Sequence, residues 1–256
     1  MLSREGIMGV SASSKVLEQT ATPPASRVRI FVNRFLFRGM LFAMGTIAVI
    51  MYKLLPNKAP VWAFARAQAR NLARLCGVRV HVRGLEHLGR EPYMFVSNHQ
   101  SHFDIAVLLG HLPGQNRFAA KKELFDEPIL GLVMRTMGMI PIDRGDPSLA
   151  IERLNRLKAD GHSTIVFPEG TRSRDGQLMQ FKKGPFVAAI QMGVPVVPVA
   201  CKGTSAIMPA GAYLSILPGD VEMIVMPPVP TAGLTYDDRE VLLERVRSAI
   251  AAALAA

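Results

Sequence analysis

The pattern of hydrophobic and polar positions changes near residue 77. Before that point, apolar residues fall in two long runs of helical character. From Val78 onward, short apolar runs typical of strands alternate with runs of helical period, which predicts an α/β domain with a mixed, mostly parallel sheet flanked by helices. We therefore expect a flexible tail at 1–27, rich in Ser, Ala, Thr and Pro, a two-helix segment at 28–77, and one α/β domain at 78–256.

The elements of this domain can be placed from their periodicity and their boundary residues. Pro141 predicts that its strand lies at an edge of the sheet, because proline donates no ladder hydrogen bond. Asp146 and Pro147 suit the start of the helix that follows. Strands are predicted at 78–83, 93–96, 118–120, 138–144, 163–167, 194–201 and 221–226, and helices from 105, at 129–137, from 146 to 159, at 184–192 and at 236–254.

The two-helix segment has the character of a membrane surface element. Its uncharged run, 39–52, is shorter than the roughly 20 residues of a spanning helix. Arg34 and Arg38 lie on one face and could reach lipid headgroups. The second helix, 61–75, carries arginines at four-residue spacing after Trp62, which suits a membrane interface. We expect a membrane-associated hairpin in one leaflet; a single span, and a second helix packed on the domain, are the alternatives.

The net charge of +10 is concentrated in this segment. Residues 1–76 hold eleven basic and two acidic side chains, and the remainder is nearly neutral. The basic residues are interleaved with aliphatic, Met and Phe residues rather than with the pattern of a nucleic-acid surface. We therefore expect membrane lipid as a partner and no nucleic acid.

A polar cluster, 97–104, follows the apolar strand 93–96, a position where α/β sheets place ligands. Within it, His99 and Asp104 are five residues apart, about 140° around an α-helix and on opposite faces of a strand. They can therefore meet only if the chain bends between them, with His99 in a turn and Asp104 in the first turn of the next helix. The helix dipole would favour an acidic residue there.

A paired imidazole is held in one tautomer, as a general base requires. The sequence contains no G-x-S-x-G motif, so Ser97 and Ser101 are weak nucleophile candidates. Such a base would activate a hydroxyl of the substrate or of water. A buried structural hydrogen bond and a metal site that includes His102 are the alternatives, but no further acidic or histidine cluster completes a coordination sphere, and the two cysteines form no CxxC pair.

A second polar cluster, 167–174, also follows a strand. Gly170 allows close approach of the backbone to a ligand, Thr171 offers a donor, and Arg172 supplies a planar fork suited to phosphate oxygens. This cluster predicts an anion clamp, with a purely structural turn as the alternative. Lys122 and Arg144 lie near the ends of other strands. They either add positive charge to the opening of the same site or are simply solvated.

Taken together, four blocks resemble the glycerolipid acyltransferase family. Residues 98–104 resemble its N-H-x-x-x-x-D block, and 167–173 match its F-P-E-G-T-R-S block. Residues 138–144 are similar to its G-x-I-x-I-D-R block, preceded by Lys122-Glu123-Leu124, and 194–199 are similar to its V-P-[IV]-[IV]-P-V strand. The blocks occur in the family's order over residues 93–200, so 78–256 is expected to be an acyltransferase domain.

The resemblance implies transfer of a fatty acyl group from acyl-CoA or acyl-carrier protein to the free hydroxyl of a lysophospholipid such as lysophosphatidate. Another acceptor, such as glycerol-3-phosphate or a lyso-aminolipid, and a non-enzymatic lipid-binding role are the alternatives. It also implies no metal or organic cofactor, and a location on the cytoplasmic face of a membrane such as the bacterial inner membrane.

The resemblance further implies roles for individual residues. His99 is expected to be the base and Asp104 to orient it. A group of four side chains and backbone positions is expected to hold the acceptor's phosphate: Glu169, Gly170, Thr171 and Arg172. Lys122 or a backbone N–H is expected to stabilise the oxyanion, and Arg144 is expected to contact substrate.

Overall fold

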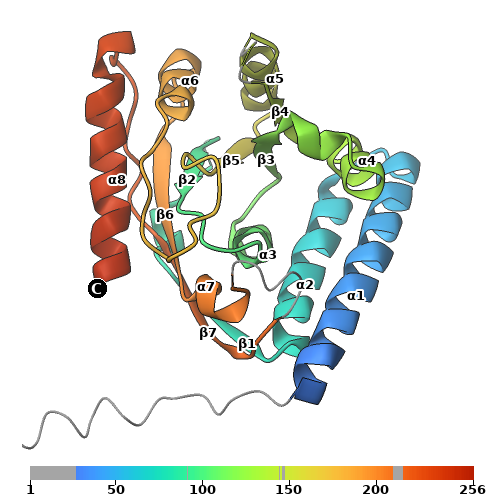
Figure 1. The fold of residues 1–256 in the computed structure, drawn as a ribbon. Helices are drawn as coiled ribbons and strands as arrows, with labels where there is room; N and C mark the ends of the chain where they lie inside the picture. Colours follow the sequence, from blue (N-terminus) through green and yellow to red (C-terminus); the bar gives the residue numbers. More distant parts are fainter. Residues whose placement is uncertain (1–26, 91, 144, 146–147, 210–215) are drawn as a thin grey trace, which may run out of the picture.

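The computed structural model describes residues 27–256 except 91, 144, 146–147 and 210–215 (Figure 1). Three of the expectations above concern residues outside this set. They are the tail up to residue 26, the candidate substrate residue Arg144, and the helix-starting pair Asp146 and Pro147.

The predicted N-terminal helices are both present, as α1 (Arg27–Leu54) and α2 (Ala59–Leu75). They pack against each other, and α2 also packs on α3 (Phe103–His111) of the domain (Figure 1). Among the described residues, the α1 portion Phe31–Leu54 is long and apolar enough to cross a membrane by length and composition, with a mean hydropathy of 1.7. Most of that portion is not buried in the protein.

The position of α2 differs from the membrane-interface prediction. Trp62 is buried, and the Arg117 guanidinium of strand β3 (Asn116–Lys121) lies 4.2 Å from the centre of its ring. Ala69 faces α3 at Gly110, where two small residues allow the helices to approach closely. The apolar side of α2 is therefore covered by the domain, which agrees with the alternative prediction of a second helix packed on the domain.

The described strands form one seven-stranded sheet in the order β1-β7-β6-β2-β5-β3-β4. The five strands from β6 to β4 are parallel, whereas β7 is antiparallel to β6 and parallel to β1. The mixed, mostly parallel sheet is therefore confirmed. So is the edge position of Pro141, because β4 pairs only with β3. The strands are β1 (Val78–Arg83), β2 (Met94–Ser97), β3 (Asn116–Lys121), β4 (Ile140–Ile142), β5 (Ser163–Val166), β6 (Val196–Lys202) and β7 (Gly219–Val225).

The predicted helices of the domain are present with ends shifted by a few residues. The short helix α7 was not predicted, because four residues are too few to show a helical period. The helices are α3 (Phe103–His111), α4 (Pro128–Thr136), α5 (Ser148–Ala159), α6 (Gly184–Met192), α7 (Thr204–Ile207) and α8 (Arg239–Ala255). Among the described residues of the domain there are also three 3₁₀ turns: η1 (Leu85–His87), η2 (Lys122–Phe125) and η3 (Tyr236–Asp238).

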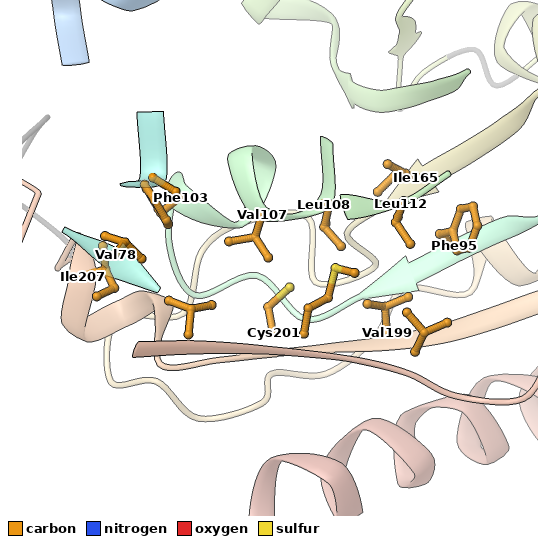
Figure 2. Close-up of a cluster of buried hydrophobic side chains, with 14 of the residues drawn as sticks. Val78, Phe95, Phe103, Val107, Leu108, Leu112, Ile165, Val199, Cys201 and Ile207 are labelled. Atoms are coloured by element: carbon orange, nitrogen blue, oxygen red, sulfur yellow. The ribbon is translucent and has the colours of Figure 1, made fainter. Parts of the chain in front are cut away.

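Helices cover both faces of the sheet. Helices α2, α3 and α7 contribute to the core on one face, and α5, α6 and α8 to the core on the other. The alternation of side chains along a strand explains how β2 serves both cores, since Phe95 belongs to the first and Met94 and Val96 to the second. Figure 2 shows side chains of the first core, among them Phe103, Val107 and Leu108 of α3 and Phe95, Val199 and Cys201 of the strands.

Because β2 to β6 are parallel, their carboxyl ends meet at one edge of the sheet. The loops 98–102 and 167–173 both leave from that edge. The topology therefore brings together two polar clusters that are about 70 residues apart in the sequence.

Candidate active site

The chain bends between β2 and α3 in the way that the spacing of His99 and Asp104 requires. Strand β2 ends at Ser97, and α3 begins at Phe103 with Asp104 in its first turn. Between them, the buried Asn98 amide exchanges two hydrogen bonds with the backbone of Cys201 on β6, at 2.9 and 2.8 Å. This side chain ties the loop to the sheet, because its amide satisfies a backbone N–H and C=O that lie beyond the parallel ladder.

His99 and Asp104 are paired. The imidazole Nδ1 lies 2.8 Å from Asp104 Oδ2, and the same oxygen accepts the backbone N–H groups of Gln100 and Ser101 at 2.8 and 2.9 Å. The Asp104 side chain is fully buried, whereas that of His99 is 13% exposed. The carboxylate is thus held by the loop and by the N-terminus of α3, and with Nδ1 engaged, Nε2 is the nitrogen left for a substrate.

The imidazole is also fixed by the second loop. The Phe167 ring stacks on it with 3.9 Å between ring centres and 15° between planes. Ser173 N–H donates to the His99 carbonyl at 2.8 Å. Aromatic stacking and backbone bonding therefore hold both the ring and the main chain of His99 in one position.

Glu169 makes its contacts with the backbone. Its carboxylate is buried, with Oε1 accepting the His99 N–H at 2.7 Å and Oε2 accepting the Met179 N–H at 3.2 Å. Burial raises the pKa of this carboxyl, and the two N–H donors offset part of the rise. Since both oxygens bond to the main chain, Glu169 supports the loop that carries His99. Its negative charge would also oppose contact with a phosphate.

The other clamp residues lie beside this support. Gly170 has a φ of 68° in the left-handed region, and a Cβ there would lie 2.7 Å from Lys182 Nζ. Thr171 is exposed and Arg172 is partly buried. Burial and the nearby Arg172 lower the pKa of His102 to about 4, so His102 is neutral at physiological pH. The positive charge at this turn therefore comes from Arg172 and the neighbouring lysine.

Lys122 lies at the same edge of the sheet, at the end of β3. Its Nζ is bonded to Asp143 Oδ2 at 2.9 Å, with the lysine side chain 61% exposed. The ion pair raises the pKa of Lys122, the hydrogen bond being the larger cause. Among the described residues, no hydrogen bond or ion pair joins Lys122 to His99.

A cavity of about 760 Å³ lies between the sheet, α5 and α6. Its wall is mostly apolar, and Phe167 and Gly170 belong to it together with Lys121, Asp143 and Lys182. Because Phe167 also stacks on His99, the cavity adjoins the imidazole. The strands and the two helices both contribute apolar side chains to the wall: Met94, Ala119, Ala120, Ile142, Ala150, Ile151, Leu154, Val166, Val187 and Ala188.

Sequence reasoning missed three features of this site. The stacking of Phe167 had a signal, an aromatic residue immediately before the polar cluster. The support by Glu169 had one as well, because a carboxylate is a poor partner for a phosphate. The cavity had none, since its wall combines residues from distant elements. Within the described part of the chain, no group of three or more His, Cys, Asp or Glu side chains could hold a metal ion.

Comparison with known proteins identifies similar chains. A family profile described as Acyltransferase matches residues 79–202. A chloroplastic 1-acyl-sn-glycerol-3-phosphate acyltransferase of Brassica napus is 42% identical over 156 residues, which are 59% of this chain and 45% of the relative. The alpha form of the enzyme from Homo sapiens is 33% identical over 224 residues, 86% of this chain and 79% of the relative.

A solved structure is similar as well. The crystal structure of the 1-acyl-sn-glycerophosphate acyltransferase PlsC from Thermotoga maritima superimposes with a TM-score of 0.71 at 26% identity, covering 88% of this chain and 95% of the other. The chain spans about half the length of the chloroplast relatives, 45% and 48%, and about four fifths of the human one, 79%.

Proposed function

The chain belongs to the acyltransferase family, and on that premise we propose that it transfers a fatty acyl group from a thioester to the free hydroxyl of 1-acyl-sn-glycerol-3-phosphate, giving phosphatidate. The thioester would be acyl-CoA or acyl-carrier protein. The observation that carries the proposal is the bond of 2.8 Å between His99 Nδ1 and the buried Asp104.

In the proposed reaction, His99 Nε2 takes the proton of the acceptor hydroxyl as its oxygen attacks the thioester carbonyl. The tetrahedral intermediate collapses with cleavage of the C–S bond, and the leaving thiolate takes the proton back from His99. Asp104 holds the tautomer and stabilises the imidazolium between these steps. The residues of the chain supply acid–base catalysis and positioning, and the proposal requires no metal or organic cofactor.

We assign the acceptor's phosphate to the turn that contains Gly170, Thr171 and Arg172. The guanidinium offers a bidentate contact, and the glycine lets phosphate oxygens approach the backbone. His102 is neutral in this setting and would add a hydrogen-bond partner without charge. Lys122 could stabilise the oxyanion only after its ion pair with Asp143 opens, and Arg144 stays a proposed substrate contact.

We assign the acyl chain of the donor to the cavity beside Phe167. Its volume of about 760 Å³ and its apolar wall suit a chain of methylene groups. The chain would enter beside Phe167, which stacks on His99, so the thioester carbonyl would lie near the imidazole. Two substrates would then meet at the imidazole, the phosphate side at Arg172 and the acyl side at the cavity.

We propose that α1 lies in one leaflet rather than crossing the membrane. Near its start, Asn33 donates to the carbonyls of Cys76 and Ile216 at 3.2 and 2.9 Å. Near its end, Ala48 packs in a cluster with Trp62 of α2. A helix attached at both ends to the domain cannot carry one end about 30 Å away across the hydrocarbon core. Its outward Phe and Ile side chains would enter the lipid instead.

We further propose the cytoplasmic face of a membrane, such as the bacterial inner membrane, as the location. The two cysteines are buried free thiols, which suits a reducing compartment. Acceptor and product are both amphiphiles, so an enzyme seated in the leaflet could exchange them without exposing their chains to water.

The test is acyl transfer by the purified full chain, with labelled acyl-CoA and acyl-carrier protein as donors. The acceptors are 1-acyl-sn-glycerol-3-phosphate, glycerol-3-phosphate and a lyso-aminolipid. Labelled phosphatidate formed by the wild type, and not by His99→Ala, supports the proposal. If only another acceptor is acylated, that acceptor takes the place of 1-acyl-sn-glycerol-3-phosphate in the proposal. Lipid binding without any acyl transfer points to a non-enzymatic role.

A further inference from the structure

The helix α4 leaves an apolar surface uncovered. Ile129 is 59% exposed and Leu132 is 47% exposed, although the opposite side of this helix is buried through Gly131 and Met134. In the 3₁₀ turn that precedes the helix, Leu124 is also exposed. We call these three side chains, Leu124, Ile129 and Leu132, the α4 face. Nothing among the described residues covers it.

The α4 face continues the outward surface of α1. The two helices are in contact, with Val133 Cγ2 placed 3.1 Å from the position of a Cβ at Gly45 (Figure 1). Ile129 lies one helical turn before Val133 and therefore on the same side of α4. On α1, Phe42 and Ile50, on either side of Gly45, are exposed as well. Apolar side chains thus extend from α1 onto the domain.

This surface lies close to the candidate active site. The turn η2 and helix α4 follow directly from the carboxyl end of β3, at the sheet edge from which the His99 loop leaves. Because Leu124 lies in η2, the α4 face begins at that edge of the sheet. The α1–α4 contact means that a body covering the α4 face would also touch α1.

The charges distinguish the two helices. From Arg27 to Leu54, α1 carries basic residues and no acidic one. Residues 121–127 carry two lysines and three acidic side chains, so their charges nearly cancel. The α4 face therefore offers no charge complementarity to a strongly charged protein partner. Its exposed apolar side chains would instead be stabilised in an apolar phase. Continuity with an apolar helix of spanning length favours lipid as that phase.

We propose that the α4 face enters the same leaflet as α1, so that the acyltransferase domain itself contacts the bilayer beside the active site. The inference rests on the proposed function in one respect, because it explains how a membrane-borne acceptor reaches His99. The contact is made by apolar burial, and the basic residues of α1 add the attraction to anionic lipid.

The test uses the full chain carrying Ile129→Ser and Leu132→Ser together. The matched control is Val241→Ser, where the replaced side chain is 71% exposed. Val241 belongs to α8, which packs against β6 and lies on the other side of the molecule from α4 (Figure 1). Vesicle flotation is measured with phosphatidylcholine alone and with added phosphatidylglycerol, at low and high salt. Activity is measured with a long-chain acceptor in vesicles and with a short-chain acceptor that stays monomeric in solution.

The double variant should lower the vesicle partition coefficient about tenfold or more, since two half-exposed aliphatic side chains lose their burial in lipid. The loss should be the same in both lipid mixtures and at both salt concentrations. Activity should fall with the vesicle-borne acceptor and persist with the soluble one. Val241→Ser should match the wild type in every assay.

Unchanged partitioning of the double variant overturns the proposal. So does a dimer of the wild type in sedimentation that the double variant abolishes while vesicle binding persists, because the occupant is then a second copy. The single variants, each expected to lower partitioning about threefold, give the same decision if the double variant unfolds. Absence of acyl transfer by the wild type refutes the proposed function alone, since flotation does not depend on activity.

Discussion

Replacing Glu169 with alanine should reduce turnover without weakening acceptor binding. The carboxylate is buried and bonds to two backbone N–H groups, those of His99 and Met179. Alanine removes both acceptors, so the N–H groups of His99 and Met179 lose their side-chain partner. The main chain of His99 then loses its support from the second loop.

The magnitude follows from the two orphaned donors. An unsatisfied buried N–H costs about 1–3 kcal/mol, so the loss of both acceptors should lower the free energy of unfolding by about 2–6 kcal/mol. At about 2–4 °C per kcal/mol for a domain of this size, the melting temperature should fall by roughly 4–24 °C. A displacement of His99 by about 1 Å should lower kcat about a hundredfold.

The matched control is Asp175→Ala in the same loop. Asp175 also accepts from a backbone N–H, that of Gln177, and from the Ser173 hydroxyl, but it is exposed. Water can replace its contacts, so both melting temperature and kcat should stay close to wild type. Glu169→Gln should be intermediate, because its amide oxygen can accept one N–H while its NH₂ opposes the other.

The assays are calorimetric melting and steady-state kinetics with the acceptor concentration varied. The reasoning predicts a lower kcat with an unchanged acceptor KM in Glu169→Ala. A raised KM with wild-type kcat would refute it, since Glu169 would then contact the acceptor. An unchanged melting temperature would refute the assignment of its two backbone hydrogen bonds.

Three further predictions concern the neighbouring residues. His99→Ala should lower kcat at least about a thousandfold with a folded protein in circular dichroism, and Asp104→Asn about a hundredfold or more; near-wild-type turnover in either would contradict the base assignment. Arg172→Ala should raise the acceptor KM about tenfold to a hundredfold with a partial rescue by lysine, and an unchanged KM would remove the arginine from the phosphate site. For His102, a pKa lowered from 6.5 to about 4 means that the folded state disfavours the imidazolium, so its contribution to stability is present above pH 6.5 and is lost as the pH falls toward 4. Denaturant titrations at several pH values measure how much free energy of unfolding is lost between pH 6.5 and pH 4. In His102→Gln this loss should be smaller by about 1–2 kcal/mol, allowing for partial exposure, and an identical loss in both proteins would refute the burial of a neutral imidazole.

Much of the fold could be predicted because its signals are local. Pro141 identified an edge strand, since a missing N–H excludes a central position whatever the rest of the sheet does. The five-residue spacing of His99 and Asp104 required a bend, because no regular helix or strand allows them to touch. Periodicity located the strands and most helices, since burial on one face imposes a period of 2 or 3.6.

Trp62 shows where local signals fail. Its position on a basic, apolar helix suits a membrane interface, yet it is buried against Arg117. An amphipathic pattern states that one face leaves water, but the same pattern serves lipid and a protein core. Only the packing of α2 on α3 decides between them.

The sequence by itself determined where the strands and most of the helices lie, that the sheet is mixed and mostly parallel, and that two polar clusters lie at strand ends. The tertiary structure decided the strand order, the support of His99 by Glu169, the apolar cavity beside Phe167 and the joining of the α4 face to α1. These features depend on contacts between residues far apart in the chain. Their free energy comes from long-range packing, which no local pattern of polar and apolar residues specifies.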